Sequence, residues 1–256
     1  MINQQIIPVE SCVEVARAIF RLTFRSAAIA SSARPGQFVN VRVDHTSTFP
    51  LLRRPFSISR VEGDLVELLF SVVGPGTRRL AQKRTGDVLD VLGPLGKPFC
   101  LDHQFDTVLI VAGGLGVAPF PFLTDALRTS DRLVVSFVGA RTASQLVRNH
   151  LRNVQAATDD GSEGFKGTVV ECLDAFLSGT PVARPRIFGC GPTPMLRALS
   201  EFANAHNLPC ELSLEGEMAC GVGICQGCPV RRSRGEKKYA LVCTEGPTFS
   251  ATEIVL

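Results

Sequence analysis

Residues 107–116, TVLIVAGGLG, decide the fold class of this chain. A continuous run rich in Val, Leu and Ile ends in Gly113, Gly114 and Gly116, and a helical pattern follows over 120–128. A short apolar run that ends in such a glycine-rich turn is typical of a buried parallel strand followed by a helix. We therefore expect an α/β sheet around this strand.

The same alternation continues towards the C-terminus. We predict further strands at 132–138, 168–170 and 186–189, and helices at 143–153, 171–177 and 194–205. Strand–helix repetition of this kind indicates a parallel sheet with helices on its faces.

The chain before residue 103 has a different character. Short β-type runs lie at 6–13, 18–23, 37–43, 54–60, 65–72 and 88–93. Turn signals such as Arg34-Pro35-Gly36 and Gly93-Pro94-Leu95-Gly96 separate them. Short strands at near-regular spacing with little helix predict a closed antiparallel β-barrel.

The alternating pattern stops near residue 207. A strand is expected at 211–214, a hairpin from 229–232 and 238–242, and irregular chain over 244–256. The predicted division is a barrel domain at 1–102, an α/β domain at 103–206 and a small cysteine-rich domain at 207–256.

Composition excludes several classes of protein. Of the 256 residues, 45% are hydrophobic and 20% are charged, which argues against a disordered chain or a coiled coil. The net charge of +3 is too small to indicate nucleic-acid binding by bulk electrostatics. No apolar stretch approaches the roughly 18 residues of a membrane span, and the N-terminus lacks a secretory pattern. We expect a cytoplasmic protein.

Four of the nine cysteines crowd into one segment. Their spacing is Cys220-x4-Cys225-x2-Cys228-x14-Cys243. A C-x4-C-x2-C loop with a distant fourth cysteine is typical of plant-type [2Fe–2S] sites. Glycines within the loop allow a close approach of backbone to the cluster. There are two alternatives. One is a structural zinc site, which usually pairs its cysteines two by two, and the other is a cysteine segment that binds no metal.

Two segments of the predicted barrel have the composition of a flavin site. An Arg and a Ser close together on an extended strand would reach a phosphate and a ring edge, and a glycine-rich turn before a helix would cradle a phosphate. An exposed arginine and a helix-capping threonine are the alternatives. The candidate residues are Arg54, Pro55, Phe56, Ser57, Leu69, Phe70, Ser71, Gly76 and Thr77.

Two glycine-rich loops of the α/β region are candidates for a nicotinamide nucleotide. Both follow predicted strands, at the carboxyl edge where open α/β sheets bind ligands. Neither has the G-x-G-x-x-G pattern, so an ordinary dinucleotide turn is only weakly indicated. A buried structural thiol is the alternative for the cysteine. The candidate residues are Gly113, Gly114, Gly116, Cys190, Gly191 and Pro192.

Taken in order, these motifs resemble the ferredoxin–NADP⁺ reductase superfamily with a C-terminal [2Fe–2S] domain. More narrowly, the chain resembles the electron-transfer subunits of type B dihydroorotate dehydrogenases. The closer likeness rests on three segments, 157–167, 218–223 and 242–247, which read ATDDGSEGFKG, MACGVG and VCTEGP. Phe56 departs from the wider superfamily, which often has Tyr there.

The resemblance implies a set of cofactors and a partner. FAD would bind between the barrel and the α/β domain, NAD would bind the α/β domain, and the four cysteines would hold the cluster. A separate FMN-containing catalytic subunit would oxidise dihydroorotate in pyrimidine biosynthesis, in a heterotetramer with two subunits of each kind. No acid–base catalytic residue is expected in this chain.

Alternative functions remain open at this point. One is a sister reductase subunit that serves a hydrogenase, a sulfite reductase or a ferredoxin transhydrogenase. Another is a zinc-stabilised binding module without redox function. The choice between NAD and NADP is also open, because Arg141 after a strand would suit either a 2′-phosphate or solvent.

Overall fold

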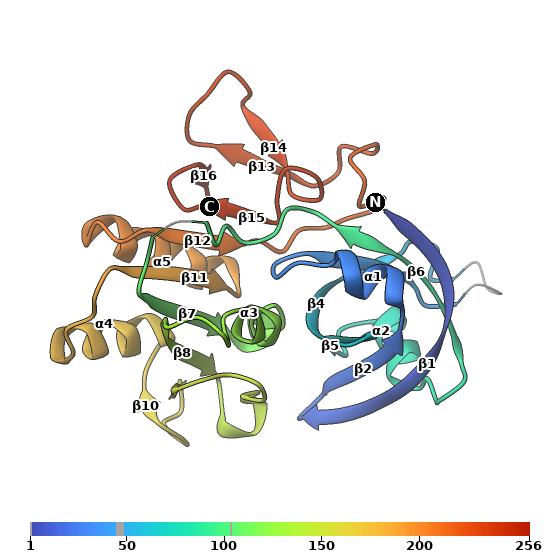
Figure 1. The fold of residues 1–256 in the computed structure, drawn as a ribbon, viewed down its shortest axis with the longest axis horizontal. Coiled ribbons are helices and arrows are strands. Elements are labelled where there is room, and N and C mark those ends of the chain that lie inside the picture. Colours follow the sequence, from blue (N-terminus) through green and yellow to red (C-terminus); the bar gives the residue numbers. More distant parts are fainter. Residues whose placement is uncertain (1, 45–48, 103) are drawn as a thin grey trace.

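The computed structural model describes residues 2–44, 49–102 and 104–256. It contains a closed six-stranded barrel, a seven-stranded sheet and a three-stranded sheet. Figure 1 shows the barrel on the right, the larger sheet with its helices on the left and the small sheet above both. The three predicted kinds of architecture are therefore present.

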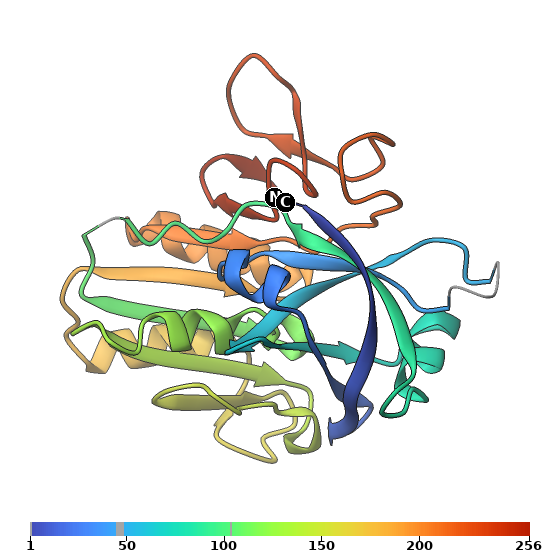
Figure 2. The same cartoon turned by 45° about the vertical axis from the view of Figure 1, so that its right-hand side comes forward.

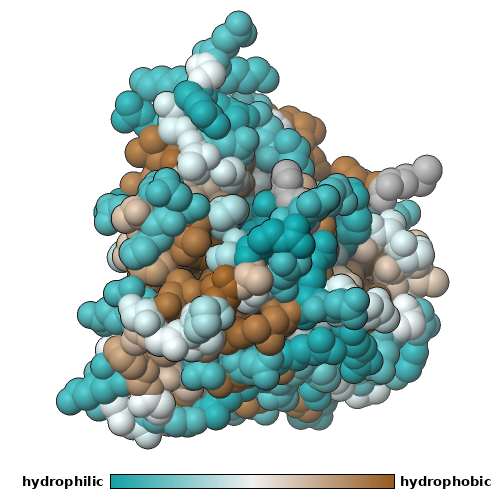
Figure 3. Space-filling view, turned by 60° about the vertical axis from the view of Figure 1, so that its left-hand side comes forward, coloured by the Kyte–Doolittle hydropathy of each residue, from teal (hydrophilic) through white to brown (hydrophobic). Residues whose placement is uncertain are grey.

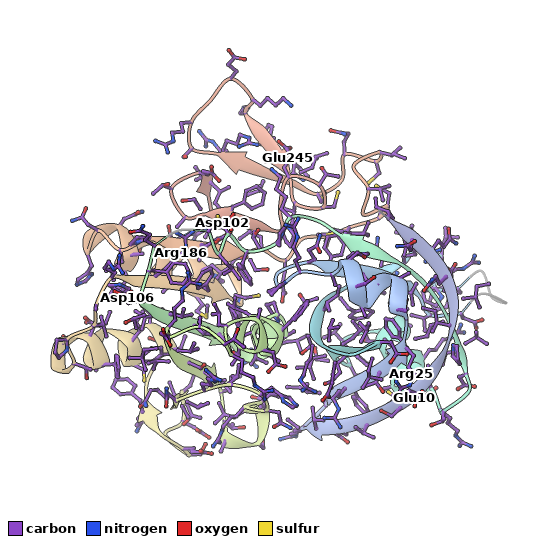
Figure 4. All side chains as sticks on the ribbon, viewed as in Figure 1. Glu10, Arg25, Asp102, Asp106, Arg186 and Glu245 are labelled. Carbon is purple, nitrogen blue, oxygen red and sulfur yellow. The ribbon has the colours of Figure 1, made fainter. Side chains whose placement is uncertain are left out.

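The barrel is antiparallel, with the strand order β1-β2-β5-β4-β3-β6. Its inward positions are apolar and fully buried, as at Phe24, Ile58 and Phe70, so the barrel interior is a packed core. Glu10 and Arg25 form an ion pair on its outer surface, where Figure 4 labels them. The elements are β1 (Asn3–Ala16), β2 (Ile19–Arg25), α1 (Ala27–Ser32), β3 (Phe38–Arg42), β4 (Arg54–Glu62), β5 (Leu65–Ser71), α2 (Pro75–Ala81) and β6 (Val88–Leu95).

The seven-stranded sheet has the order β10-β9-β8-β7-β11-β12-β15. All its pairs are parallel except β12 with β15. Every residue of β7 is buried, as expected for a central strand covered on both faces. The strands are β7 (Thr107–Gly113), β8 (Leu133–Ala140), β9 (Val154–Thr158), β10 (Phe165–Lys166), β11 (Pro185–Cys190), β12 (Cys210–Ser213) and β15 (Thr248–Ser250). The helices are η1 (Gly114–Val117), α3 (Phe120–Ala126), η2 (Ala143–Gln145), α4 (Val169–Gly179) and α5 (Thr193–Ala205).

The small sheet contains β13 (Pro229–Arg232), β14 (Tyr239–Leu241) and β16 (Ile254–Val255), in the order β14-β13-β16. The predicted hairpin is confirmed, whereas the prediction of irregular chain over 244–256 is wrong, because β15 and β16 form there. Because β12 and β15 both belong to the larger sheet, the chain after residue 207 is anchored in that sheet at two places. The division at 206/207 stays a prediction.

Two predictions in the α/β region are wrong. The expected helix over 143–153 is reduced to the single turn η2, and β9 follows it. His150 and Asn153 have φ values of +62° and +47°, which a right-handed helix does not tolerate. Residues 168–170 do not form a strand, because Thr168 caps α4 and accepts a hydrogen bond from the Glu171 amide.

The barrel and the larger sheet are joined by packed and charged contacts. Helix α3 packs against β4, and Arg60 Nε donates to Asp125 Oδ2 over 2.7 Å. In the part of the chain that the structure describes, no helix is long and apolar enough to cross a membrane.

Candidate functional site

A cavity of about 270 Å³ lies where the barrel meets the seven-stranded sheet. Strands β4 and β5 with helix α2 line it on the barrel side, and η1 with the carboxyl ends of β11 and β12 line it on the sheet side. The carboxyl edge of a parallel sheet is where α/β folds bind ligands, and domain junctions are preferred ligand sites.

The residues predicted for a flavin gather on the barrel wall. Since β4 and β5 are paired antiparallel strands, the predicted segments 54–57 and 69–71 lie on neighbouring strands there. Gly76 does not line the cavity but lies behind Arg54, whose Nε is 3.3 Å from the position of a Cβ at Gly76. The predicted residues that line the cavity are Arg54, Pro55, Phe56, Ser57, Leu69, Phe70, Ser71 and Thr77.

Thr77 also has a local structural role. Its Oγ1 accepts hydrogen bonds from the amides of Val73 and Gly74, over 2.9 and 3.1 Å. This contact secures the turn that starts α2. The predicted N-cap role of Thr77 is therefore wrong, because Gly74 is the N-cap and Thr77 is the third residue of α2, whose side chain bonds back to the N-cap amide.

Cys190 faces the barrel wall from the end of β11. Its side chain is buried and lines the cavity. Burial, followed by the nearby Glu215 carboxylate, raises the pKa of this thiol well above its ordinary value. Cys190 therefore contributes a buried thiol to the cavity wall.

Gly116 is needed for this arrangement. A Cβ on Gly116 would overlap the carbonyl group of Cys190, so only glycine lets η1 pack against the end of β11. Leu115 and Ala118 on either side line the cavity. The glycine turn therefore brings the two nicotinamide candidate loops into direct contact.

The remaining nicotinamide candidates lie outside this cavity. A Cβ on Gly113 would meet Met195, which is in the first turns of α5. Gly191 and Pro192 line a second cavity of about 500 Å³ that shares Glu215 and Gly216 with the first. Among the described residues, Gly114 lines neither cavity and a Cβ there would meet open space.

The end of β12 and the segment after it form a cavity wall that was not predicted. Ser213, Glu215 and Met218 all line the cavity. Ser213 and Cys190 both line this wall, and burial raises the pKa of Glu215. The sequence places these residues at the end of a predicted strand or just after it, at the same carboxyl edge as Cys190, but no motif distinguishes them.

The cysteine loop begins directly beyond that cavity wall. Cys220 is two residues after Met218, and its Sγ accepts hydrogen bonds from the amides of Val222 and Cys225, over 3.5 and 3.4 Å. Burial alone would raise the pKa of Cys220, but these amide hydrogen bonds outweigh it and lower the pKa to about 6. The loop therefore favours the thiolate, the form that binds metals.

The other two cysteines are buried beneath the loop. The Cys243 amide donates to Cys228 Sγ over 3.4 Å, and burial, followed by the neighbouring Cys228, raises the pKa of Cys243 to about 12. Amide–sulfur hydrogen bonds thus link Cys225 to Cys220 and Cys243 to Cys228. Within the described ranges, no three side chains of His, Cys, Asp or Glu are arranged so that they could hold one metal ion.

A barrel residue holds the cysteine loop. Asn40 on β3 is fully buried, and its Nδ2 donates to the Cys220 carbonyl over 3.1 Å. A Cβ on Gly221 would overlap that same amide group, and Gly221 has a φ of +72°. Nothing in the sequence pattern indicates this contact, because 180 positions separate Asn40 from Cys220.

Comparisons with known proteins agree with this geometry. Residues 215–255 match the family model of the iron–sulfur cluster binding domain of dihydroorotate dehydrogenase B. The dihydroorotate dehydrogenase B (NAD⁺) electron transfer subunit of Desulforamulus reducens is 40% identical over 250 residues, which cover 94% of each chain. The corresponding subunit of Bacillus caldolyticus is 38% identical over 264 residues and covers both chains completely.

Solved structures give the same fold over nearly the whole chain. The structure of an NADH-dependent reduced ferredoxin-NADP oxidoreductase aligns with a TM-score of 0.86 and 28% identity, over 97% of this chain and 89% of that one. A ferredoxin NADP⁺ reductase from Neisseria gonorrhoeae aligns at 0.66 with 16% identity, over 80% of this chain and 91% of that one, and shows the fold alone. With full-length relatives at 38–40% identity, the resemblance predicted from the motifs is confirmed, and the chain belongs to the family of dihydroorotate dehydrogenase B electron-transfer subunits.

Proposed function

We propose that this chain carries electrons from a dihydroorotate-oxidising catalytic subunit to NAD⁺ in pyrimidine biosynthesis. The observation that carries the proposal is the continuity of the cavity wall with the cysteine loop, since Met218 lines the cavity and Cys220 follows two residues later. A cofactor in the cavity and one in the loop would therefore be neighbours, as electron transfer between them requires.

FAD is the proposed occupant of the barrel–sheet cavity. Arg54 would pair with a phosphate, with Gly76 behind it leaving room for its side chain, and Thr77 in the first turn of α2 would lie near the phosphates. Ser57 and the end of β5 would meet the flavin ring. Cys190 and Glu215 would lie on the opposite side. The apolar lining with a few polar groups supports this fit.

A [2Fe–2S] cluster is the proposed occupant of the cysteine loop, held by Cys220, Cys225, Cys228 and Cys243. The amides already directed at Cys220 and Cys228 support the fit, because amide–sulfur hydrogen bonds stabilise cluster thiolates and set their potential. Such a cluster exchanges single electrons, whereas a flavin handles one or two, so the two cofactors together link one-electron and hydride chemistry.

NAD is the proposed ligand of the sheet edge. The residues proposed to bind NAD lie in two neighbouring loops. One contains Gly113, Gly114 and Gly116, and the other contains Cys190, Gly191 and Pro192. The second cavity, which shares the Glu215 wall with the first, leaves space beside the proposed flavin. The protein's part is to bind and orient the nucleotide, and no side chain is assigned an acid–base step.

The proposed partner is an FMN-containing catalytic subunit, in a heterotetramer of two subunits of each kind. Cys225 is exposed at the tip of the cysteine loop, and the adjacent Ile224 is 82% exposed. An apolar tip at the point where the cluster is most accessible supports docking of a redox partner there.

Anaerobic purification with the catalytic subunit tests the whole proposal. We expect a coloured complex that contains FAD, FMN, and two iron and two acid-labile sulfide atoms per copy of this chain. The complex should reduce NAD⁺ when dihydroorotate is added. Material that contains zinc, or neither iron nor sulfide, would contradict the cluster assignment. A partner that evolves hydrogen or reduces sulfite would contradict the choice of reaction.

Arg54→Ala is expected to lower FAD occupancy by at least about tenfold at limiting flavin, because it removes a charge-assisted phosphate contact. Flavin absorbance per chain after dialysis measures this. Arg17→Ala is the matched control, since Arg17 is exposed in the β1–β2 turn away from the cavity. Equal flavin content in both variants would remove Arg54 from the site.

A further inference from the structure

The positive charge of the chain is concentrated in one hairpin. Residues 231–238, RRSRGEKK, contain five cations and one anion, a net charge of +4. Because the whole chain carries +3, the other 248 residues have a net charge of −1. We call Arg231, Arg232, Arg234, Lys237 and Lys238 the cationic hairpin.

Most of this charge faces solvent. Arg232 is half-buried and pairs with Glu245 over 2.7 Å, whereas the other four cations are exposed. Within the described ranges, no carboxylate forms an ion pair with Arg231, Arg234 or Lys238. Figures 1 and 2 both show the β13–β14 hairpin projecting from the molecule, and Figure 3 shows that this projection is hydrophilic.

A groove connects the hairpin to the cysteine loop. Its volume is about 660 Å³, and its walls come from the hairpin, from the loop and from the segment after Cys243. Lys237 and Tyr239 stand on one side, and Gln226, which directly follows the exposed Cys225, stands on the other. Figure 4 shows nitrogen-tipped side chains gathered on this hairpin beside the labelled Glu245. A protein that approaches Cys225 along the groove therefore passes Lys237, which is next in sequence to the exposed Lys238 of the cationic hairpin.

We propose that the cationic hairpin and its groove form an electrostatic docking surface for an acidic face of the catalytic subunit. This inference rests on the proposed function and adds the chemistry of the partner surface. Charges at the rim of an interface chiefly raise the association rate, and their effect is screened by salt within a Debye length of about 10 Å at 0.1 M. The hairpin is placed to guide the partner towards the exposed end of the cluster loop.

A solubility role is the competing explanation, since lysines and arginines also protect edge strands such as β14 from pairing. The two roles differ in one measurable respect. Steering depends on where the cations are, so it is lost when these particular charges are reversed. Protection of an edge strand depends only on charge being present, so glutamates would serve equally well.

The test is the association rate of the flavin- and cluster-loaded chain with the purified catalytic subunit over a range of salt concentrations. In the variant Arg234→Glu/Lys237→Glu/Lys238→Glu we expect the rate at low salt to fall about tenfold or more, and its salt dependence to flatten or reverse. The matched control, Arg17→Glu/Arg84→Glu/Arg128→Glu, changes net charge equally at exposed positions on other elements and should lose less than about threefold.

Several outcomes would overturn the inference. Equal rates and salt slopes for the wild type and the hairpin variant would leave the hairpin without a docking role, while the proposed function stands. An equal loss in both variants would mean that only net charge matters. If the wild type itself fails to bind the catalytic subunit, the proposed function and the inference both fall. Flavin and iron content, together with the milder Lys237→Ala/Lys238→Ala variant, exclude misfolding as the cause of a loss.

Discussion

Cys225→Ser is expected to abolish electron exchange with the catalytic subunit while NADH oxidation by an artificial two-electron acceptor is retained. A serine hydroxyl is a poor replacement for a thiolate on iron, and Cys225 is the most exposed of the four candidate ligands. The flavin cavity lies on the other side of Cys220 and keeps all its residues. The partner-dependent rate should fall by more than about a hundredfold, because removing a residue that merely hydrogen-bonds a metal ligand already costs about 10–100-fold.

Two assays on the same preparation check this result. Dihydroorotate-dependent reduction of NAD⁺ reports on the path through the cluster, and NADH-dependent reduction of 2,6-dichlorophenolindophenol, a two-electron acceptor, reports on the flavin. Cys12→Ser serves as the control, because Cys12 is a half-buried thiol of the barrel that donates to the Leu80 carbonyl and lies outside the cysteine loop. Equal loss of both activities in Cys225→Ser would mean that the cysteine segment has a structural role instead.

Gly221→Ala is expected to prevent assembly of the cluster, with iron content below about a tenth of the wild-type value. The residue has a φ of +72°, which costs an L-residue about 1–2 kcal/mol, and the new methyl group would overlap Asn40. Asn40 is buried and cannot move aside without losing its hydrogen bond to Cys220. The loop would be displaced from the barrel, and its cysteines with it.

Gly63→Ala is a control that places an alanine at a positive φ without any steric overlap. Gly63 has a similar φ of +61°, but a Cβ there meets nothing within 4 Å. Its iron content should therefore match the wild type. Asn40→Ala should partly restore iron to Gly221→Ala by making room for the methyl group. Full cluster occupancy in Gly221→Ala alone would contradict this prediction, because it would show that Asn40 moves aside without displacing the cysteine loop.

Local patterns in the sequence were sufficient for most of the fold. The six barrel strands are found near their predicted positions, because alternation and turn residues are properties of neighbouring positions. The failure over 143–153 has a non-local cause. Apolar residues there have a helical spacing, but Asn153 donates to the Val134 carbonyl over 2.8 Å and adopts a positive φ. A contact across the sheet thus overrides helix propensity.

The flavin candidates were predictable for a similar reason. Arg54, Ser57 and Leu69 lie on paired strands, and the register of β4 with β5 brings them to one wall. Glu215 was not predicted, because a lone carboxylate after a short strand has no distinguishing pattern. It becomes part of the site only because β12 is placed next to β11 in the sheet.

The sequence by itself determined the architecture, the family and the cysteine quartet, because periodicity, glycine turns and ligand spacing are all encoded within short windows of chain. Only the tertiary structure decided which residues surround the cavity, that Asn40 holds the loop of Cys220, and that the cationic hairpin shares a groove with Gln226. These contacts join segments that are separated in sequence. Their energies arise from packing and hydrogen bonding in three dimensions, which no local window of sequence contains.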